Sequence, residues 1–437
     1  MKTFQSRWIR YGSVALYILL SFLSFYCACY KLPVGLKYGI NLVVFAWACA
    51  AFFVSPQFEH ALFCLRFFIL FFFPYLMFWL WSAGIWITEF QSWPYILRGS
   101  QNIIYMLTNI LYVIGAVYLF DENATTYTLI SMALANFAVF VQVGLRFGFP
   151  RLISEYITLL LTFADNTGGA VRQMELHDMV YGWGTYVVYY MIHPSFKGEK
   201  NIWKFIVSVF FFTLAMKRIA IPGAMAAVTF YWVMKWFVKR FGTRPLRGII
   251  TIITVVSIAG LFGYLMIIRS GLFIELAERY DVDLMSRDRL WTFYQDIYWL
   301  SPTYLGKGIR FIYNYGSTHM ENIDIPIAVV HNVFLELYIE TGFWCWIVWL
   351  FYELSFRVKR LLEMFDAEAA LGMMAMNIYV FSTYLTDNTS FYFPINVTYR
   401  LVMMTWCYEI LRYRQKKVVV PVYDCLLYTS PSPRDCS

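Results

Sequence analysis

The chain has 437 residues, of which 60% are hydrophobic, 21% are aromatic and only 14% are charged. A soluble protein of this length cannot bury so much apolar side-chain surface, so the composition excludes a water-soluble globular enzyme and indicates a helical protein that crosses a membrane several times. The formal net charge of +8 does not indicate nucleic-acid binding, because the basic residues occur in short clusters beside apolar runs, where they orient a membrane protein.

The apolar runs predict about twelve membrane spans, since a helix needs about 20 apolar residues to cross the hydrocarbon core. The first run lacks a small-residue cleavage site, which indicates a span and not a cleavable signal peptide. Residues 151–163 predict an interfacial or re-entrant helix. The approximate limits of the spans are 11–30, 38–55, 61–81, 102–120, 126–145, 178–193, 202–216, 219–238, 248–268, 330–353, 370–386 and 395–411.

Clusters of basic residues all fall on one side of this topology. The positive-inside rule places that side, and both ends of the chain, in the cytoplasm. Arg66 is an exception, because it lies inside the third apolar run; a charge there is costly, so we expect its side chain to snorkel or to face a cavity. The clusters are Lys2, Arg7 and Arg10; Lys197, Lys200 and Lys204; Lys235, Lys239, Arg240, Arg244 and Arg247; Arg357, Lys359 and Arg360; and Arg412, Arg414, Lys416 and Lys417.

The predicted organisation has four parts. Residues 1–268 form a membrane bundle of nine spans, 269–329 form a large extracytoplasmic loop with an amphipathic helix, and 330–424 form the last three spans and the cytoplasmic end. Residues 425–437 resemble the translation of a sequencing adapter, and we interpret them as an assembly artefact. The cysteines before this tail lie within apolar runs, a distribution that supports neither a disulfide framework nor a zinc site.

The loop at 269–329 and its borders hold the candidate chemistry. His331 begins the tenth span directly after the loop, and Arg218 lies at the corner between the seventh and eighth spans. A helical spacing in the loop predicts one aromatic face with a cation at its end, formed by Arg287, Leu290, Trp291, Tyr294 and Tyr298.

These residue types suit the transfer of a sugar from a lipid diphosphate. Arginine presents a planar fork of donors to phosphate oxygens and stays charged, so it can stabilise a departing diphosphate without a metal. Histidine can take a proton from an acceptor hydroxyl, and aromatic faces such as those of Trp291 and Tyr294 can stack against sugar rings. Taken one at a time, the same residues are also typical of interfacial anchors, helix caps and an aromatic belt.

Two further groups of polar residues are candidates. Asp281-Val282-Asp283 resembles the paired aspartates that hold a divalent metal in sugar-nucleotide transferases, and Glu321 and Asp324 could join it; a solvated loop is the simpler interpretation. His177 lies near the outer start of the sixth span, where it could line the same substrate cavity.

The chain resembles the O-antigen ligase and surface-polysaccharide polymerase superfamily of bacterial membrane glycosyltransferases. The His-Asn pair with its downstream Glu-x-Gly is the most specific part, and the arrangement of spans around one large outer loop extends the likeness over most of the chain. The matching residues are Ser286-Arg287 with Trp291 after them, Pro302 to Gly308, and His331-Asn332 with Glu340-Thr341-Gly342.

This resemblance implies an all-α, C-type glycosyltransferase-like membrane fold and an inverting, metal-independent transfer with no cofactor. The donor would be a glycan on undecaprenyl diphosphate, and the acceptor would be lipid A–core for a ligase or a second lipid-linked repeat for a polymerase. The family's diphosphate-binding arginines correspond to Arg287 and Arg218, although this chain has Lys217 where the family has serine; Arg289 could replace Arg287. The family histidine corresponds to His331, as a base or an acceptor-site residue, and Asn332 and Glu340 join the candidate cavity.

The expected function is therefore that of an O-antigen ligase in the bacterial inner membrane. A repeat-unit polymerase is the main alternative, because it uses the same donor and acceptor pockets leave no short motif. A lipid-linked oligosaccharide transporter is a more distant alternative, because the chain shows no evident repeated halves and its polar residues gather outside the membrane.

Overall fold

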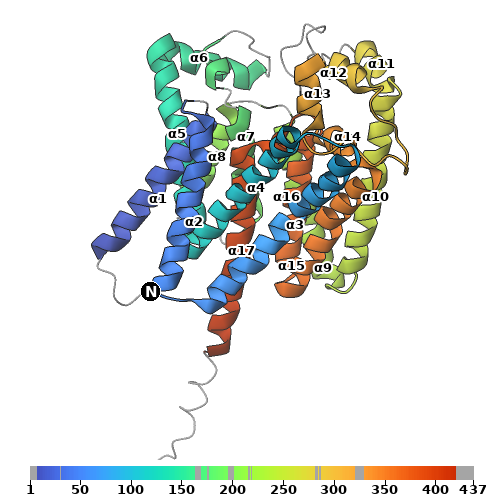
Figure 1. Ribbon diagram of the computed structural model, residues 1–437. Helices are drawn as coiled ribbons and strands as arrows, with labels where there is room; N and C mark the ends of the chain where they lie inside the picture. The colour runs from blue at the N-terminus through green and yellow to red at the C-terminus, as the bar shows by residue number, and fades with distance from the viewer. Residues whose placement is uncertain are drawn as a thin grey trace, which may run out of the picture.

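The computed structural model describes residues 7–29, 31–162, 169–174, 177–194, 201–214, 217, 219–280, 284, 287–319 and 329–419. Every regular element in these ranges is a helix. The long apolar helices lie side by side and the short helices of the 269–329 region gather at one end of the bundle (Figure 1).

The helices follow the predicted spans in chain order, with one helix for each predicted apolar run. Short helices interrupt the series at the predicted interfacial segment and in the large loop. The bounds of the first ten are α1 (Arg7–Ala28), α2 (Val34–Val54), α3 (Phe58–Thr88), α4 (Trp93–Phe120), α5 (Asn123–Phe147), α6 (Phe149–Thr162), α7 (His177–Ile192), α8 (Ile202–Leu214), α9 (Ala220–Phe241) and α10 (Leu246–Arg269). The others are α11 (Leu272–Arg279), α12 (Arg287–Tyr294), α13 (Phe311–His319), α14 (Val333–Phe351), the π-helical turn η5 (Tyr352–Phe356), α15 (Arg357–Met364), α16 (Ala367–Tyr384) and α17 (Phe393–Val419).

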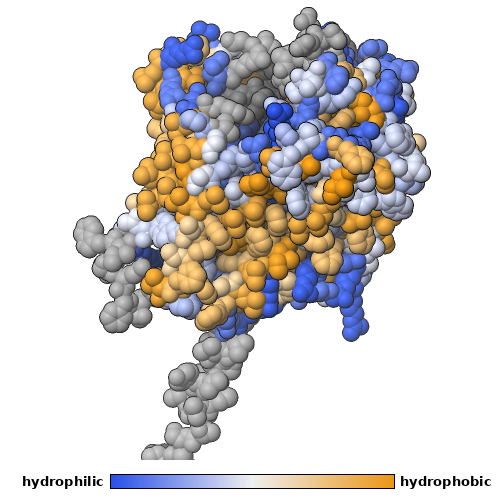
Figure 2. Space-filling model, in the orientation of Figure 1, coloured by the Kyte–Doolittle hydropathy of each residue, from blue (hydrophilic) through white to orange (hydrophobic). Residues whose placement is uncertain are grey.

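Eight helices in the described part of the chain are long and apolar enough to cross a membrane. They are α1 to α5, α9, α10 and the segment Val333–Met364, which consists of α14, η5 and α15 and which we call the rod. The protein is therefore a polytopic helical membrane protein, as the composition predicts. Space-filling colours agree, because apolar side chains form a broad belt between two more polar ends (Figure 2).

One end of the bundle gathers the basic clusters, and we call it the basic end. Lys235 of α9 pairs with Glu368 of α16 at 2.7 Å, and Arg247 of α10 pairs with Glu363 of α15 at 3.0 Å. Arg412, near the end of α17, binds Glu122 in the turn before α5. These contacts of Lys235, Arg247 and Arg412 join the ends of helices that the sequence analysis placed on a single side.

The opposite end, which we call the loop end, carries α6, α11, α12 and α13 (Figure 1). The amphipathic helix α6 corresponds to the predicted interfacial segment: it buries Leu152 and Leu159 and leaves Ile153 and Leu161 exposed. The predicted loop helix is confirmed as α12, whose buried face contains Leu290, Trp291 and Tyr294, with Tyr298 buried just beyond it.

Helix α14 is broken at Gly342, whose φ of 73° and ψ of 180° are not helical. The loop before α13 docks into this break: Phe343 N–H donates to Tyr304 O at 2.9 Å, and Gly308 N–H donates to Glu340 O at 2.8 Å. A Cβ atom on Gly342 would lie 2.2 Å from the carbonyl carbon of Leu305. The close approach explains why both motif segments, Pro302–Gly308 and Glu340–Gly342, contain glycine where they meet.

Replacing Gly342 with alanine should destabilise the protein. The substitution places a side chain in a backbone region that only glycine adopts readily, which costs about 1–3 kcal/mol, and adds the clash with Leu305. We expect a lower unfolding temperature for the detergent-purified protein. Gly260→Ala is the matched control, because a Cβ there meets nothing within 4 Å in helix α10. Equal unfolding temperatures for the two variants would contradict the docking of the loop against Gly342.

The two ends of the bundle should face opposite sides of the membrane. Arg240 at the basic end and Ser317 in α13 are both exposed, so cysteines placed there should react with a membrane-impermeant maleimide from opposite sides. The parent chain gives the background labelling. Labelling of both cysteines from one side in sealed vesicles would refute the topology.

Candidate functional site

Asn332 joins the ends of three helices at the loop end. Its side chain is fully buried and caps α14, because its Oδ1 accepts a hydrogen bond from Leu335 N–H at 3.0 Å. Its Nδ2 donates to the Tyr264 hydroxyl of α10 at 2.8 Å and to the Leu385 carbonyl after α16 at 3.2 Å. The amide therefore fixes the start of α14 against α10 and the segment that follows α16.

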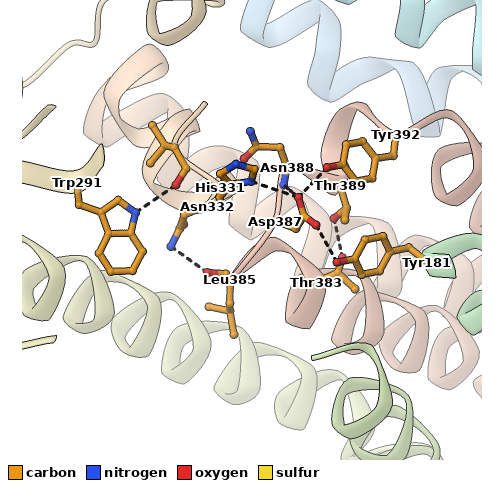
Figure 3. Close-up of polar contacts among 11 residues, drawn as sticks. Tyr181, Trp291, His331, Asn332, Thr383, Leu385, Asp387, Asn388, Thr389 and Tyr392 are labelled. Carbon is orange, nitrogen blue, oxygen red and sulfur yellow. Dashed lines mark hydrogen bonds and ion pairs between the residues drawn. The ribbon is translucent and has the colours of Figure 1, made fainter. Parts of the chain in front are cut away.

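His331, the residue before this cap, faces Asp387 (Figure 3). Its Nδ1 lies 3.6 Å from Asp387 Oδ1, and its side chain is 28% exposed while that of Asp387 is 8% exposed. His331 also has a positive φ of 50°, an uncommon conformation for a residue other than glycine. The contact with the carboxylate is made through Nδ1 of the ring.

Asp387 is held by donors on three sides (Figure 3). The Tyr181 hydroxyl of α7 donates to Oδ2 at 2.9 Å, and the Tyr392 hydroxyl and the Asn388 N–H donate to Oδ1 at 2.7 and 2.8 Å. Burial alone would raise the pKa of this carboxyl, but His331, both tyrosines and the amide stabilise the charged form and together hold its pKa well below the usual range. Asp387 is therefore ionised at neutral pH.

Arg287 begins α12 and its side chain is partly buried. Its charge interacts electrostatically with the hydroxyls of Tyr181 and Tyr264, which are bonded to Asp387 and Asn332 respectively. The guanidinium is thus near enough to act electrostatically on tyrosines that are bonded to the polar cluster around His331. Its buried Nε has no hydrogen-bond partner among the described residues.

Asn388 is unsatisfied as well. Both polar atoms of its buried side-chain amide lack a hydrogen-bond partner within the described chain, although it lies beside His331 (Figure 3). Buried polar groups are nearly always paired, so an unpaired donor at Nδ2 and an unpaired acceptor at Oδ1 call for an explanation. With Arg287 Nε, this end of the bundle therefore holds two buried donors and one buried acceptor that have no partner among the described residues.

Three other predicted site residues have packing contacts. Trp291 Nε1 donates to Val330 O at 3.2 Å, next to His331, and the Tyr294 hydroxyl donates to Ile312 O at 3.0 Å. Both rings are buried, so in this structure they support the loop and present no open stacking face. Glu340 is fully buried, and its Oε1 accepts from Ile312 N–H at 3.2 Å.

The remaining predicted residues are less close to this cluster or lie outside the described set. Arg289 is exposed on the opposite face of α12, where it lines a surface hollow with Ile274 and Phe293, so Arg287 is the inward-facing arginine of the pair. His177 starts α7, but its side chain is not described. Arg218, Asp281, Asp283, Glu321 and Asp324 all lie outside the described residues.

The sequence analysis missed several polar residues at this end. Asp387 and Tyr392 lie between the last two spans, where no motif marks them. Lys37 of α2 and Asp178 of α7 are both buried and interact electrostatically, so Asp178 offsets the charge of this lysine. In the described chain no group of three or more His, Cys, Asp or Glu side chains is placed to hold a metal ion; the Asp281/Asp283 hypothesis concerns residues outside it.

Comparison with known proteins assigns the chain to no family. No family model matches the chain, and no curated protein matches it either.

Replacing Asp387 with asparagine should lower stability at neutral pH. The carboxylate has a lowered pKa in the folded state, so its contribution is fully present above the unfolded-state pKa of about 3.9 and is lost as the pH falls below that value. Because hydrogen bonds to a charged group contribute about 1.5–3 kcal/mol, we expect a deficit of about 2 kcal/mol at pH 7.

Unfolding measured in detergent from pH 7 to pH 3 checks this expectation. The difference between Asp387→Asn and the parent should shrink as the pH falls below about 4. Asp296→Asn, at an exposed position of the same loop region, should show no such trend. A deficit that stays constant with pH would show that the charge of Asp387 is not what stabilises the site.

Proposed function

We propose that this protein is a membrane glycosyltransferase that moves a glycan from undecaprenyl diphosphate to an acceptor, as an O-antigen ligase does. The observation that carries the proposal is the polar cluster at the loop end, in which His331 faces Asp387. The charge of Arg287 acts on Tyr181, which is bonded to Asp387, and on Tyr264, which is bonded to Asn332. The motif resemblance selects the same His331, Asn332 and Arg287, which supports the proposal independently of the packing.

Arg287 binds the diphosphate of the donor. Its guanidinium is positively charged, is not paired with a described carboxylate, and begins a helix, where backbone N–H groups also favour an anion. As the bond between the anomeric carbon and the diphosphate oxygen breaks, negative charge grows on the leaving group. A fixed guanidinium stabilises that charge.

His331 takes the proton of the acceptor hydroxyl. The acceptor oxygen attacks the anomeric carbon from the face opposite the diphosphate, forms the new glycosidic bond and inverts the configuration. The hydroxyl proton moves to Nε2 of His331, and undecaprenyl diphosphate leaves with the electron pair of the broken bond. Asp387 orients the imidazole through Nδ1 and stabilises its protonated form.

The same proposal assigns the membrane arrangement. We infer that α7, α8, α16 and α17 complete a set of about twelve spans, because apolar residues dominate each of them and nearly all of α7 and α16 is buried among the longer helices. The basic end then faces the cytoplasm with both chain ends, and the loop end lies outside a bacterial inner membrane.

Two other functions remain as alternatives. A polymerase would use the same donor and the same His331 and Arg287, with a second lipid-linked repeat in place of lipid A–core as acceptor. A transporter of lipid-linked oligosaccharides is less well supported, since the chain shows no evident repeated halves.

Replacing Arg287 with alanine should abolish glycan transfer in a deletion strain of the host that is complemented with each variant. The neutral side chain removes the charge that stabilises the diphosphate, and losses of about a hundredfold or more are typical when one such group is removed. Arg287→Lys should keep partial activity, and Arg289→Ala should be close to the parent. Glycan display by a membrane-inserted Arg287→Ala protein at the parent level would refute the role.

Gels of the deletion strain distinguish the functions. Long polymer stranded on the lipid carrier identifies a ligase, and single repeats on the final acceptor identify a polymerase. An unchanged glycan profile would reject both transferase functions.

A further inference from the structure

A groove on the lipid-facing surface lies between α3 and the rod formed by α14, η5 and α15. One wall is a single face of α3 and the other is one stripe of the rod. The groove has a volume of about 450 Å³ and is lined by Arg66, Ile69, Leu70, Phe73, Val348, Phe351, Tyr352, Phe356, Arg360 and Met364. The Tyr352 hydroxyl donates to Leu70 O at 2.9 Å, which fixes the two walls relative to each other.

The floor and rims of this groove are apolar and accessible. Ile69, Phe73, Val348, Phe351 and Phe356 are all exposed, although each belongs to a helix long and apolar enough to cross the membrane. Apolar side chains exposed at this depth contact hydrocarbon, so a chain of methylene groups is the matching ligand.

Two arginines stand at one end of the groove. Arg66 is exposed and makes no hydrogen bond or ion pair with any described residue, although it interrupts an apolar run of α3. Arg360 is also exposed, and its neighbour Glu363, at 3.5 Å, is shared with Arg247 at 3.0 Å. The Glu363 carboxylate is thus shared by Arg360 and Arg247, and this end of the groove retains a net positive charge.

The length of the groove suits one leaflet. Arg66 and Phe73 are separated by roughly 10 Å along α3, and Arg360 and Val348 by roughly 18 Å along the rod, at 1.5 Å per residue. Half of a hydrocarbon core is about 15 Å thick. The arginine end lies toward the basic end of the bundle, where Glu363 binds Arg247.

We propose that this groove binds an anionic glycerophospholipid from the leaflet at the basic end. Its phosphate lies between Arg66 and Arg360, and one acyl chain lies along Ile69, Phe73 and Val348. Basic pockets between membrane helices on this side recognise anionic headgroups, and guanidinium groups bind phosphate oxygens. The site is at the far end of the molecule from His331, and it does not depend on the proposed glycan transfer.

Native mass spectrometry of the detergent-purified chain tests the site. The probes are phosphatidylglycerol and phosphatidylcholine with identical acyl chains. We expect tighter binding of phosphatidylglycerol, and about 30-fold weaker apparent affinity for it in Arg66→Gln/Arg360→Gln, because each arginine near an anionic headgroup contributes about 1 kcal/mol and 1.4 kcal/mol is tenfold.

Two further variants separate this site from general attraction. Arg240→Gln/Arg244→Gln removes two exposed arginines at the same end but outside the groove, and it should bind phosphatidylglycerol as the parent does. Val348→Trp fills the groove and should weaken binding while both arginines remain. The proposal is overturned if both lipids bind equally, if the groove pair has no effect, or if the control pair has the same effect as the groove pair.

Discussion

The hydrogen bonds of Asn332 are the constraint on which the loop end of this protein depends. One buried amide caps α14, holds Tyr264 of α10 and binds the carbonyl of Leu385 after α16. The Leu385 carbonyl accepts a hydrogen bond from the Tyr264 hydroxyl as well, so Asn332, Tyr264 and Leu385 are bonded to one another. With Asn332 fixed, the preceding His331 has little freedom, and it takes a positive φ opposite Asp387. The position of His331 opposite Asp387 thus follows from the hydrogen bonds that Asn332 makes.

The break in α14 is a second place where hydrogen bonds fix the large loop to this helix. Non-helical backbone is tolerated there because the loop before α13 supplies partners: Phe343 N–H reaches Tyr304 O, and Glu340 O accepts from Gly308 N–H. The large loop is therefore anchored at Gly342 as well as near His331, where Trp291 binds Val330 O. These two attachment points, at Gly342 and at Val330 just before α14, hold α12 in a fixed position relative to α14. Arg287 is the first residue of α12, so its position is fixed as well.

Local pattern predicted the helices and part of the site. Apolar runs located the helices of the bundle, and spacing in the loop located α12, because both depend on neighbours in sequence. The sequence analysis did not predict Asp387 as a site residue, because its contact with His331 depends on α16 ending at the loop end. No neighbouring residue in the sequence indicates that contact. The helical spacing correctly placed Trp291 and Tyr294 on one face of α12. Periodicity alone does not distinguish a face that contacts a ligand from one that packs against a neighbouring segment. In the structure the Trp291 indole and the Tyr294 hydroxyl both donate to backbone carbonyls of neighbouring segments.

The hydrogen bonds around Asp387 bear on which group would act as the base in the transfer that we propose. Oδ2 of Asp387 accepts a hydrogen bond from the Tyr181 hydroxyl. Oδ1 accepts hydrogen bonds from the Tyr392 hydroxyl and from the Asn388 N–H. A carboxylate so fully occupied, with its pKa held low, is a poor acceptor for another proton. His331 is different, since its ring is partly exposed and its ion-pair contact with Asp387 is made through Nδ1. In the transfer that we propose, the imidazole of His331 is therefore the better placed of the two groups to take the proton of the acceptor hydroxyl, while Asp387 holds the ring from its Nδ1 side.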